Sequence, residues 1–139
     1  MKTFAFIAVL FLSSTAARAD EQLSSSSLSG LACKATNTFG TSELSLQSGV
    51  VKVTINSVPS DSYNVTDLGT STSYGYAYVN LAGTSGGDVL TLVFPNAKLA
   101  TGQQILRGVL YASLTSDPAK TMVGMGEPWA EVTCLTTVK

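Results

Sequence analysis

Two carboxylates near the C-terminus are the first candidates for chemistry. Glu127 and Glu131 flank Trp129, and a carboxylate pair beside an indole is a pattern found in glycoside hydrolysis. The chain has no histidine, so the commonest general base, and any Ser-His-Asp triad, is missing. We favour the simpler interpretation, in which Gly126-Glu127-Pro128 is a turn before a strand with one solvent-facing acid. The sequence predicts a protein that is not an enzyme and that uses no cofactor.

A second polar cluster has the oxygen ligands that calcium prefers. Asp61, Asn64 and Asp67 recur at intervals of three residues, and hard cations bind carboxylate and amide oxygens. The spacing differs from that of an EF-hand loop, and side chains of this kind commonly form turns with their own backbone. We therefore expect residues 57–72 to be a long polar loop that holds no metal.

The two cysteines, Cys33 and Cys134, stand almost at the two ends of the domain. Zinc sites need three or four Cys or His ligands, and a C-x-x-C redox motif is absent. An even number of cysteines in an exported chain favours a disulfide over free thiols. We predict a structural disulfide that joins the first and last strands and has no catalytic role.

The best binding candidate is a stripe of tyrosines. Tyr74, Tyr76 and Tyr78 alternate with small and apolar residues, so a strand would place the three rings on one face. Tyrosine gives apolar contact and a polar tip, which suits a glycan or a protein partner. The alternative is a sheet face where the rings pack against cross-strand neighbours. Trp129 is a further aromatic candidate for binding.

The N-terminus has the parts of an export signal. Lys2 precedes an apolar run at residues 4–12, and Ala17-Arg18-Ala19 is a small-residue cleavage site. Of eight basic residues, Lys2 and Arg18 leave with the signal, so six remain against nine acids, a net charge of −3. An acidic chain of this kind argues against nucleic acid as a partner. No later apolar run is long enough to span a membrane, so we expect an exported protein, periplasmic or secreted.

The remaining chain reads as one all-β domain. Residues 1–19 are the predicted signal peptide, 20–30 a flexible serine-rich arm, and 31–139 the folded domain. Short runs rich in Val, Ile, Thr, Leu and Tyr alternate with Gly, Asn and Pro clusters, as is typical of strands and turns. The predicted strands are 31–36, 43–47, 50–56, 73–81, 88–94, 103–114 and 129–135, with a weaker one at 121–125. This pattern predicts an antiparallel β-sandwich or a small β-barrel of seven to eight short strands.

Three functions fit these features. The first is a non-enzymatic binding or structural module that contacts a protein or glycan of the cell envelope or exterior, through the tyrosine face or the loop at residues 57–72. The second is an inhibitor of a hydrolase (of the lysozyme or protease type), acting through a rigid loop, for which residues 57–72 are the longest candidate. In layout the chain resembles small bacterial exported proteins, periplasmic inhibitors of lysozyme among them, and Ser73-Tyr74-Gly75-Tyr76 has the residue types of their inhibitory loop. The likeness rests on the order of the parts and carries no site residue over. The third is a barrel that binds a small ligand in an interior cavity.

Overall fold

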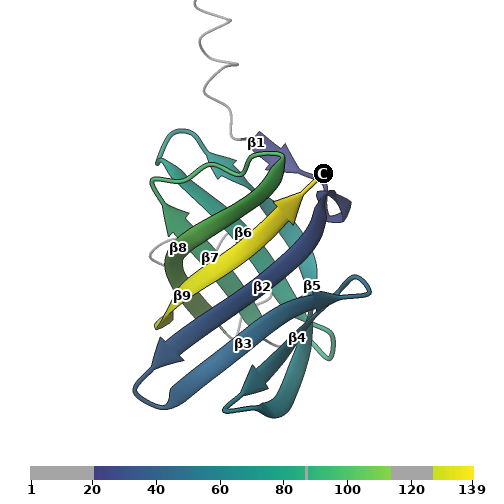
Figure 1. The fold of residues 1–139 in the computed structure, drawn as a ribbon, viewed down its shortest axis with the longest axis vertical. Coiled ribbons are helices and arrows are strands. Elements are labelled where there is room, and N and C mark those ends of the chain that lie inside the picture. Colours follow the sequence, from purple (N-terminus) through teal and green to yellow (C-terminus); the bar gives the residue numbers. More distant parts are fainter. Residues whose placement is uncertain (1–20, 87, 114–126) are drawn as a thin grey trace, which may run out of the picture.

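The fold is a closed antiparallel barrel of eight strands with one short strand added (Figure 1). The computed structural model describes residues 21–86, 88–113 and 127–139; the predicted signal peptide and the candidate strand at 121–125 lie outside them. Along the chain the elements are β1 (Glu21–Leu23), the 3-10 helix η1 (Ser25–Ser27), β2 (Leu28–Asn37), β3 (Gly40–Gln47), β4 (Val50–Ile55), β5 (Val58–Ser71), β6 (Tyr76–Gly83), β7 (Val89–Pro95), β8 (Gly102–Ser113) and β9 (Glu127–Val138).

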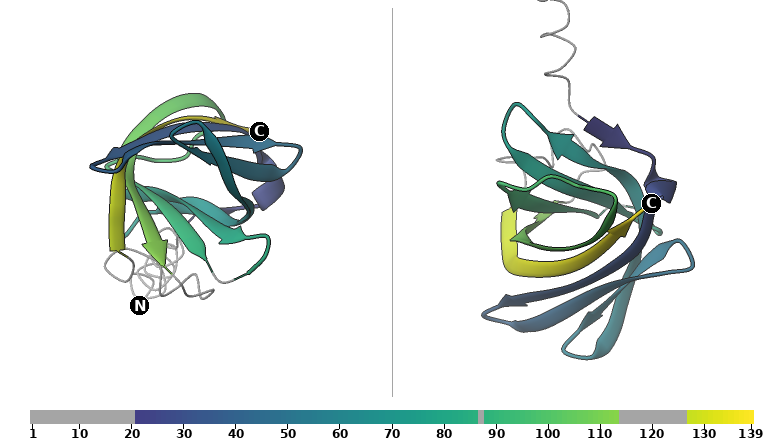
Figure 2. Two further views of the ribbon diagram at one scale, coloured as in Figure 1. Left: turned by 90° about the horizontal axis from the view of Figure 1, so that it is seen from below. Right: turned by 45° about the horizontal axis from the view of Figure 1, so that its top comes forward.

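Each barrel strand from β2 to β9 pairs with the next one in the chain, and β9 closes the ring by pairing with β2. Figure 2 shows the strands wrapped around a common interior when the molecule is seen from below. The seven main predicted strands are all present, with ends that differ by up to three residues from the prediction. The structure therefore confirms the all-β prediction and selects the barrel over the sandwich.

Alternation of side chains builds the barrel interior. On β2, Leu31, Cys33 and Ala35 are buried while Lys34 between them is exposed. The interior side chains of all eight barrel strands pack into one hydrophobic cluster. Its largest fully buried members are Phe94, Leu44, Leu68, Leu81, Leu92, Leu110, Val51 and Val79. Apolar side chains from every strand thus fill the centre of the barrel, as expected for eight strands.

The prediction of a long loop at residues 57–72 is wrong. Residues 58–71 form β5, the longest strand, which pairs with β4 and then with β6. Its pairing shifts register twice, between Lys52 and Thr54 of β4 opposite it and between Val65 and Asp67 on β5 itself. A bulge reverses the side-chain alternation at each shift. The sequence consequently has no continuous two-residue period here, although the backbone is extended throughout.

The described residues of the predicted serine-rich arm form β1, η1 and the start of β2, and they contact one end of the barrel. β1 pairs with the second half of β5, and Gln22 donates from Nε2 to Asp67 Oδ1 at 2.7 Å. Glu21 forms an ion pair of 3.3 Å with Lys98. The amide of Lys139 donates to the carbonyl of Ser27 at 2.8 Å. These contacts hold both described ends of the chain against the same end of the barrel.

β7 and β8 pair over only part of their length. Their register runs from Val89 opposite Ser113 to Val93 opposite Val109. The backbone groups of a strand point alternately to its two neighbours, so the next residue of β7 that would face β8 with its amide position is Pro95. Proline has no N–H to donate, which ends a ladder at this point. The other half of β8 continues beside β9 alone among the described strands. Among the described strands, residues 102–108 of β8 therefore pair with β9 only, and their other edge is not paired with β7.

Candidate functional site

The tight turn between β5 and β6 presents the first tyrosine of the predicted stripe. The amide of Gly75 donates to the carbonyl of Ser71 at 2.8 Å, and Gly75 has a positive φ of 73° that glycine adopts without strain. The amide of Tyr74 donates to Ser71 Oγ at 3.4 Å. The carbonyl of Gly75 accepts from the amide of Asn96 at 2.7 Å. These bonds fix the turn, and they leave the side chain of Tyr74 83% exposed.

The three tyrosines contact one another in sequence. The rings of Tyr74 and Tyr76 have centroids 6.4 Å apart with planes at 23°, and the rings of Tyr76 and Tyr78 have centroids 6.1 Å apart with planes at 64°. Both arrangements are favourable for aromatic pairs. Exposure falls along the row: Tyr76 is half-buried and Tyr78 is only 5% exposed. The accessible part of the stripe is therefore Tyr74 with the neighbouring Tyr76.

The opposite face of β6 faces the barrel interior, in agreement with the predicted alternation. Ala77, Val79 and Leu81 are fully buried members of the hydrophobic cluster. Tyr78 and Asn80 lie on the outer face, and both are buried too. This end of the stripe belongs to the packed structure of the protein, and only its beginning can meet a large partner.

Asn80 links the outer face of β6 to its neighbours on both sides. Its Oδ1 accepts from Thr91 Oγ1 at 2.8 Å, and its Nδ2 donates to Asp67 Oδ2 at 3.5 Å. Asp67 also accepts from Gln22. One of the three candidate calcium ligands is thus occupied by protein donors, while Asp61 and Asn64 are exposed on β5. Within residues 21–86, 88–113 and 127–139, no group of three acidic or cysteine side chains is placed to hold a metal ion.

Trp129 lies apart from the tyrosines. It is on β9, and β7 and β8 separate it from β6. Its side chain is 36% exposed, and its carbonyl accepts from Asn37 Nδ2 at 3.1 Å. Neighbouring strands lie about 4.8 Å apart, and two strands lie between β9 and β6. Trp129 and the tyrosine stripe therefore do not form one surface. Glu131 is exposed on the same strand, and the side chain of Glu127 is outside the description.

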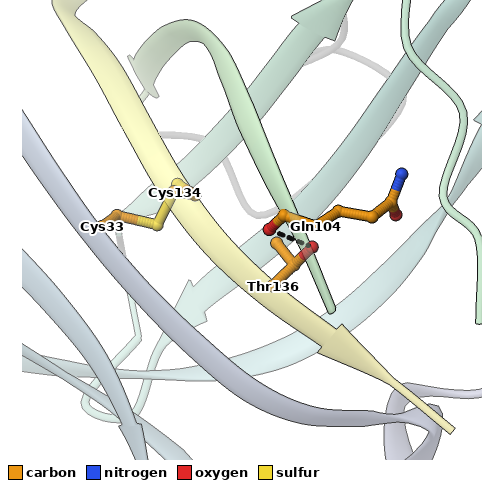
Figure 3. The surroundings of a disulfide bond; sticks show 4 residues. All are labelled: Cys33, Gln104, Cys134 and Thr136. Carbon is orange, nitrogen blue, oxygen red and sulfur yellow. Dashed lines mark hydrogen bonds between the residues drawn. A yellow bond between two sulfur atoms is a disulfide. The ribbon is translucent and has the colours of Figure 1, made fainter. Parts of the chain in front are cut away.

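The cysteines form the predicted disulfide. Cys33 on β2 and Cys134 on β9 are directly opposite each other, with their Cα atoms 4.0 Å apart, and both are buried (Figure 3). Near them Thr136 donates from Oγ1 to the carbonyl of Gln104 at 3.5 Å. The disulfide joins β2, the first strand of the barrel, to β9, the last, and lies among the apolar side chains of the interior.

Sequence reasoning missed the residues that hold the Tyr74 turn. Ser71 supplies both the carbonyl and the hydroxyl that fix it. A signal exists in the sequence, since a serine followed four residues later by a glycine suits an αL turn end. The predicted strand at 73–81 obscured it.

Comparison of the chain with protein-family models, curated protein sequences and solved structures gives no match. No helix in the described part of the chain is long and apolar enough to cross a membrane.

Proposed function

We propose that this protein is an exported, non-enzymatic binding module that contacts a glycan or protein of the cell envelope or exterior through Tyr74 and Tyr76. The observation that carries the proposal is the exposure of Tyr74 on a turn fixed by hydrogen bonds. A large aromatic ring held in solvent loses little conformational freedom on binding. The predicted signal peptide supports export, and the disulfide fits an oxidising compartment.

A hydrolase inhibitor is a second candidate with a specific observation in its favour. Such a protein needs a rigid loop that enters a cleft, and the segment 57–72, which the sequence predicts as a loop, is strand β5 over residues 58–71. The β5–β6 turn now supplies the rigid element, because its backbone bonds to Ser71 and to Asn96. An assay of lysozymes and secreted proteases with and without the protein separates this function from simple binding.

Affinity capture tests the proposed binding module. The bait is residues 20–139, presented to immobilised glycans and to extracts of the envelope and exterior, beside the variants Tyr74→Ser and Phe39→Ser. Phe39 is the matched control, since it is also 83% exposed but lies in the β2–β3 turn. A partner that binds the wild type and Phe39→Ser but not Tyr74→Ser supports the proposal. A partner retained equally by all three proteins contradicts it.

A further inference from the structure

The outer face of β2, β9 and β8, which faces the viewer in Figure 1, contains two adjoining hollows. One has a volume of about 700 Å³ and extends over β3 and β4, and the other has about 560 Å³ and reaches the place where β7 leaves β8. Lys34 and Thr133 line both. A ligand on this face can therefore contact both hollows at once.

An apolar row crosses the larger hollow. Ala32 on β2, Leu135 on β9 and Ile105 on β8 are in register with one another. Their side chains point away from the barrel interior, and Ile105 is 70% and Leu135 40% exposed. Two large aliphatic side chains side by side in solvent form a small patch that gains by contact with another apolar surface.

A polar row with two positive charges runs beside the apolar one. Lys34 on β2, Thr133 on β9 and Arg107 on β8 are in register with one another, and each lies two residues from the member of the apolar row on its own strand. The ion pair between Lys98 and Glu21 is the one found in the described part of the chain, so neither Lys34 nor Arg107 pairs with a described carboxylate. Two cations and a hydroxyl are suitable donors for a carboxylate or phosphate group.

Acidic side chains on this face limit the charge of a ligand. Glu43 is opposite Lys34 in the β2–β3 register, and Glu131 lines the smaller hollow. With Lys52 as a third cation in the larger hollow, the lining has three positive and two negative side chains. The face suits a ligand with one anionic group beside an apolar part.

We propose that this face binds a single anionic amphiphile, with its carboxylate or phosphate head group at Lys34 and Arg107 and its alkyl chain over Leu135 and Ile105. The charge of the chain favours a single molecule over a membrane surface, since the predicted mature protein is acidic and would be repelled by anionic lipid. The site is independent of the Tyr74 turn, which lies between β5 and β6.

Titration with sodium laurate below its critical micelle concentration tests the site, with dodecyl phosphate as the second anionic probe. We expect saturable binding and shifts of the backbone amide NMR signals of Ile105, Arg107, Thr133 and Leu135. Arg107→Gln and Lys34→Gln should each weaken binding about 3- to 5-fold, in the range of an exposed ion pair. Ile105→Ser should weaken it about 10-fold. All three residues are exposed, so the variants keep the fold.

Matched probes and variants identify the contributions. Dodecyl maltoside, which has the alkyl chain of dodecyl phosphate and no charge, should bind more weakly and be insensitive to Arg107→Gln, and acetate should not bind. Lys139→Gln and Val58→Ser change an exposed cation and an exposed apolar residue elsewhere and should leave laurate binding unchanged, as should Tyr74→Ser. Saturable binding of laurate, of dodecyl phosphate or of both, with these losses in the variants, supports the site. Absence of saturable binding, or equal binding by wild type, Arg107→Gln and Ile105→Ser, overturns it.

Discussion

Cys33 and Cys134 are separated by 101 residues in sequence, yet they occupy directly opposed positions on the two strands that close the barrel. Every other neighbouring pair of barrel strands is consecutive in the chain, so a short or moderate connection keeps each pair together. The β2–β9 pair alone among the barrel strands must bring the two ends of the domain together. The disulfide therefore lies at the one seam where closing the ring costs the most chain entropy.

Removal of the disulfide should lower stability substantially. For a closed loop of about 100 residues the chain-entropy model gives about 4–5 kcal/mol, at the upper part of the range for native disulfides. We expect the double variant Cys33→Ala/Cys134→Ala, and the wild type in dithiothreitol, to show a lower thermal midpoint and a lower free energy of unfolding in urea. An unchanged midpoint after complete reduction would mean that strand pairing alone holds the seam.

Gly108 should not tolerate a side chain. A Cβ at this position would overlap the carbonyl oxygen of Val93, because β8 still approaches β7 closely one residue beyond the end of their ladder. The obstacle is backbone, which cannot move aside as a flexible side chain can. We expect Gly108→Ala to reduce the free energy of unfolding by about 1–3 kcal/mol, measured by urea denaturation. A loss below about 0.5 kcal/mol, as at ordinary surface sites, would show that β7 shifts freely.

Asn56 should stabilise the contact between two hairpin turns at one end of the barrel. Its Oδ1 accepts from the amide of Thr41 at 3.0 Å, and its Nδ2 donates to the carbonyl of Phe39 at 3.3 Å. Asn56 also has a positive φ of 49°, which asparagine tolerates better than alanine. We expect Asn56→Ala to cost about 1–2 kcal/mol in urea unfolding.

The control for that variant is Asn64→Ala, at an exposed position on β5. Its cost should stay within about 0.5 kcal/mol, as at ordinary surface sites. Equal losses for the two asparagines would indicate that the bonds to Thr41 and Phe39 contribute nothing to stability.

The sequence allowed prediction of the strands whose alternation is uninterrupted. In β4 the buried Val51 and Val53 alternate with exposed Lys52, and the same period placed Ala77 and Val79 of β6 inside. β5 could not be found in this way, because its bulges break the period and its polar residues are those of turns. A barrel and a sandwich share the same alternation, so only the pairing of β2 with β9 and of β5 with β6 distinguishes them.

The candidate site was predictable in its residue types but not in its extent. The spacing placed Tyr74, Tyr76 and Tyr78 on one face, yet the burial of Tyr78 depends on tertiary contacts that no local pattern contains. The row of Lys34, Thr133 and Arg107 could likewise not be predicted, because it brings β2 beside β8 and β9, from which β2 is far apart in sequence. Register between distant strands is set by the whole barrel, and a single sequence does not reveal it.

Tyr63 should make the protein sensitive to alkaline pH. Its side chain is buried in the barrel interior, and burial, together with the negative charges of Asp88 and Asp61, raises the pKa of its phenol above the usual value of 10.0. Below pH 10 both the folded and the unfolded chain keep the proton. As the pH rises above 10 toward the raised folded pKa, the unfolded chain releases it first, so the free energy of unfolding falls.

Tyr63→Phe removes this contribution. We expect urea denaturation of the variant to show a smaller loss of stability between pH 9 and pH 11 than the wild type, in experiments at constant ionic strength. Tyr74→Phe is the control for loss of a phenol at an exposed position. If Tyr63→Phe and the wild type lose stability in parallel over this interval, ionisation of Tyr63 is not linked to unfolding. A smaller loss confined to Tyr63→Phe would show that folding favours the neutral phenol, since an ionised oxygen there would lose part of its hydration and face the negative charges of Asp88 and Asp61.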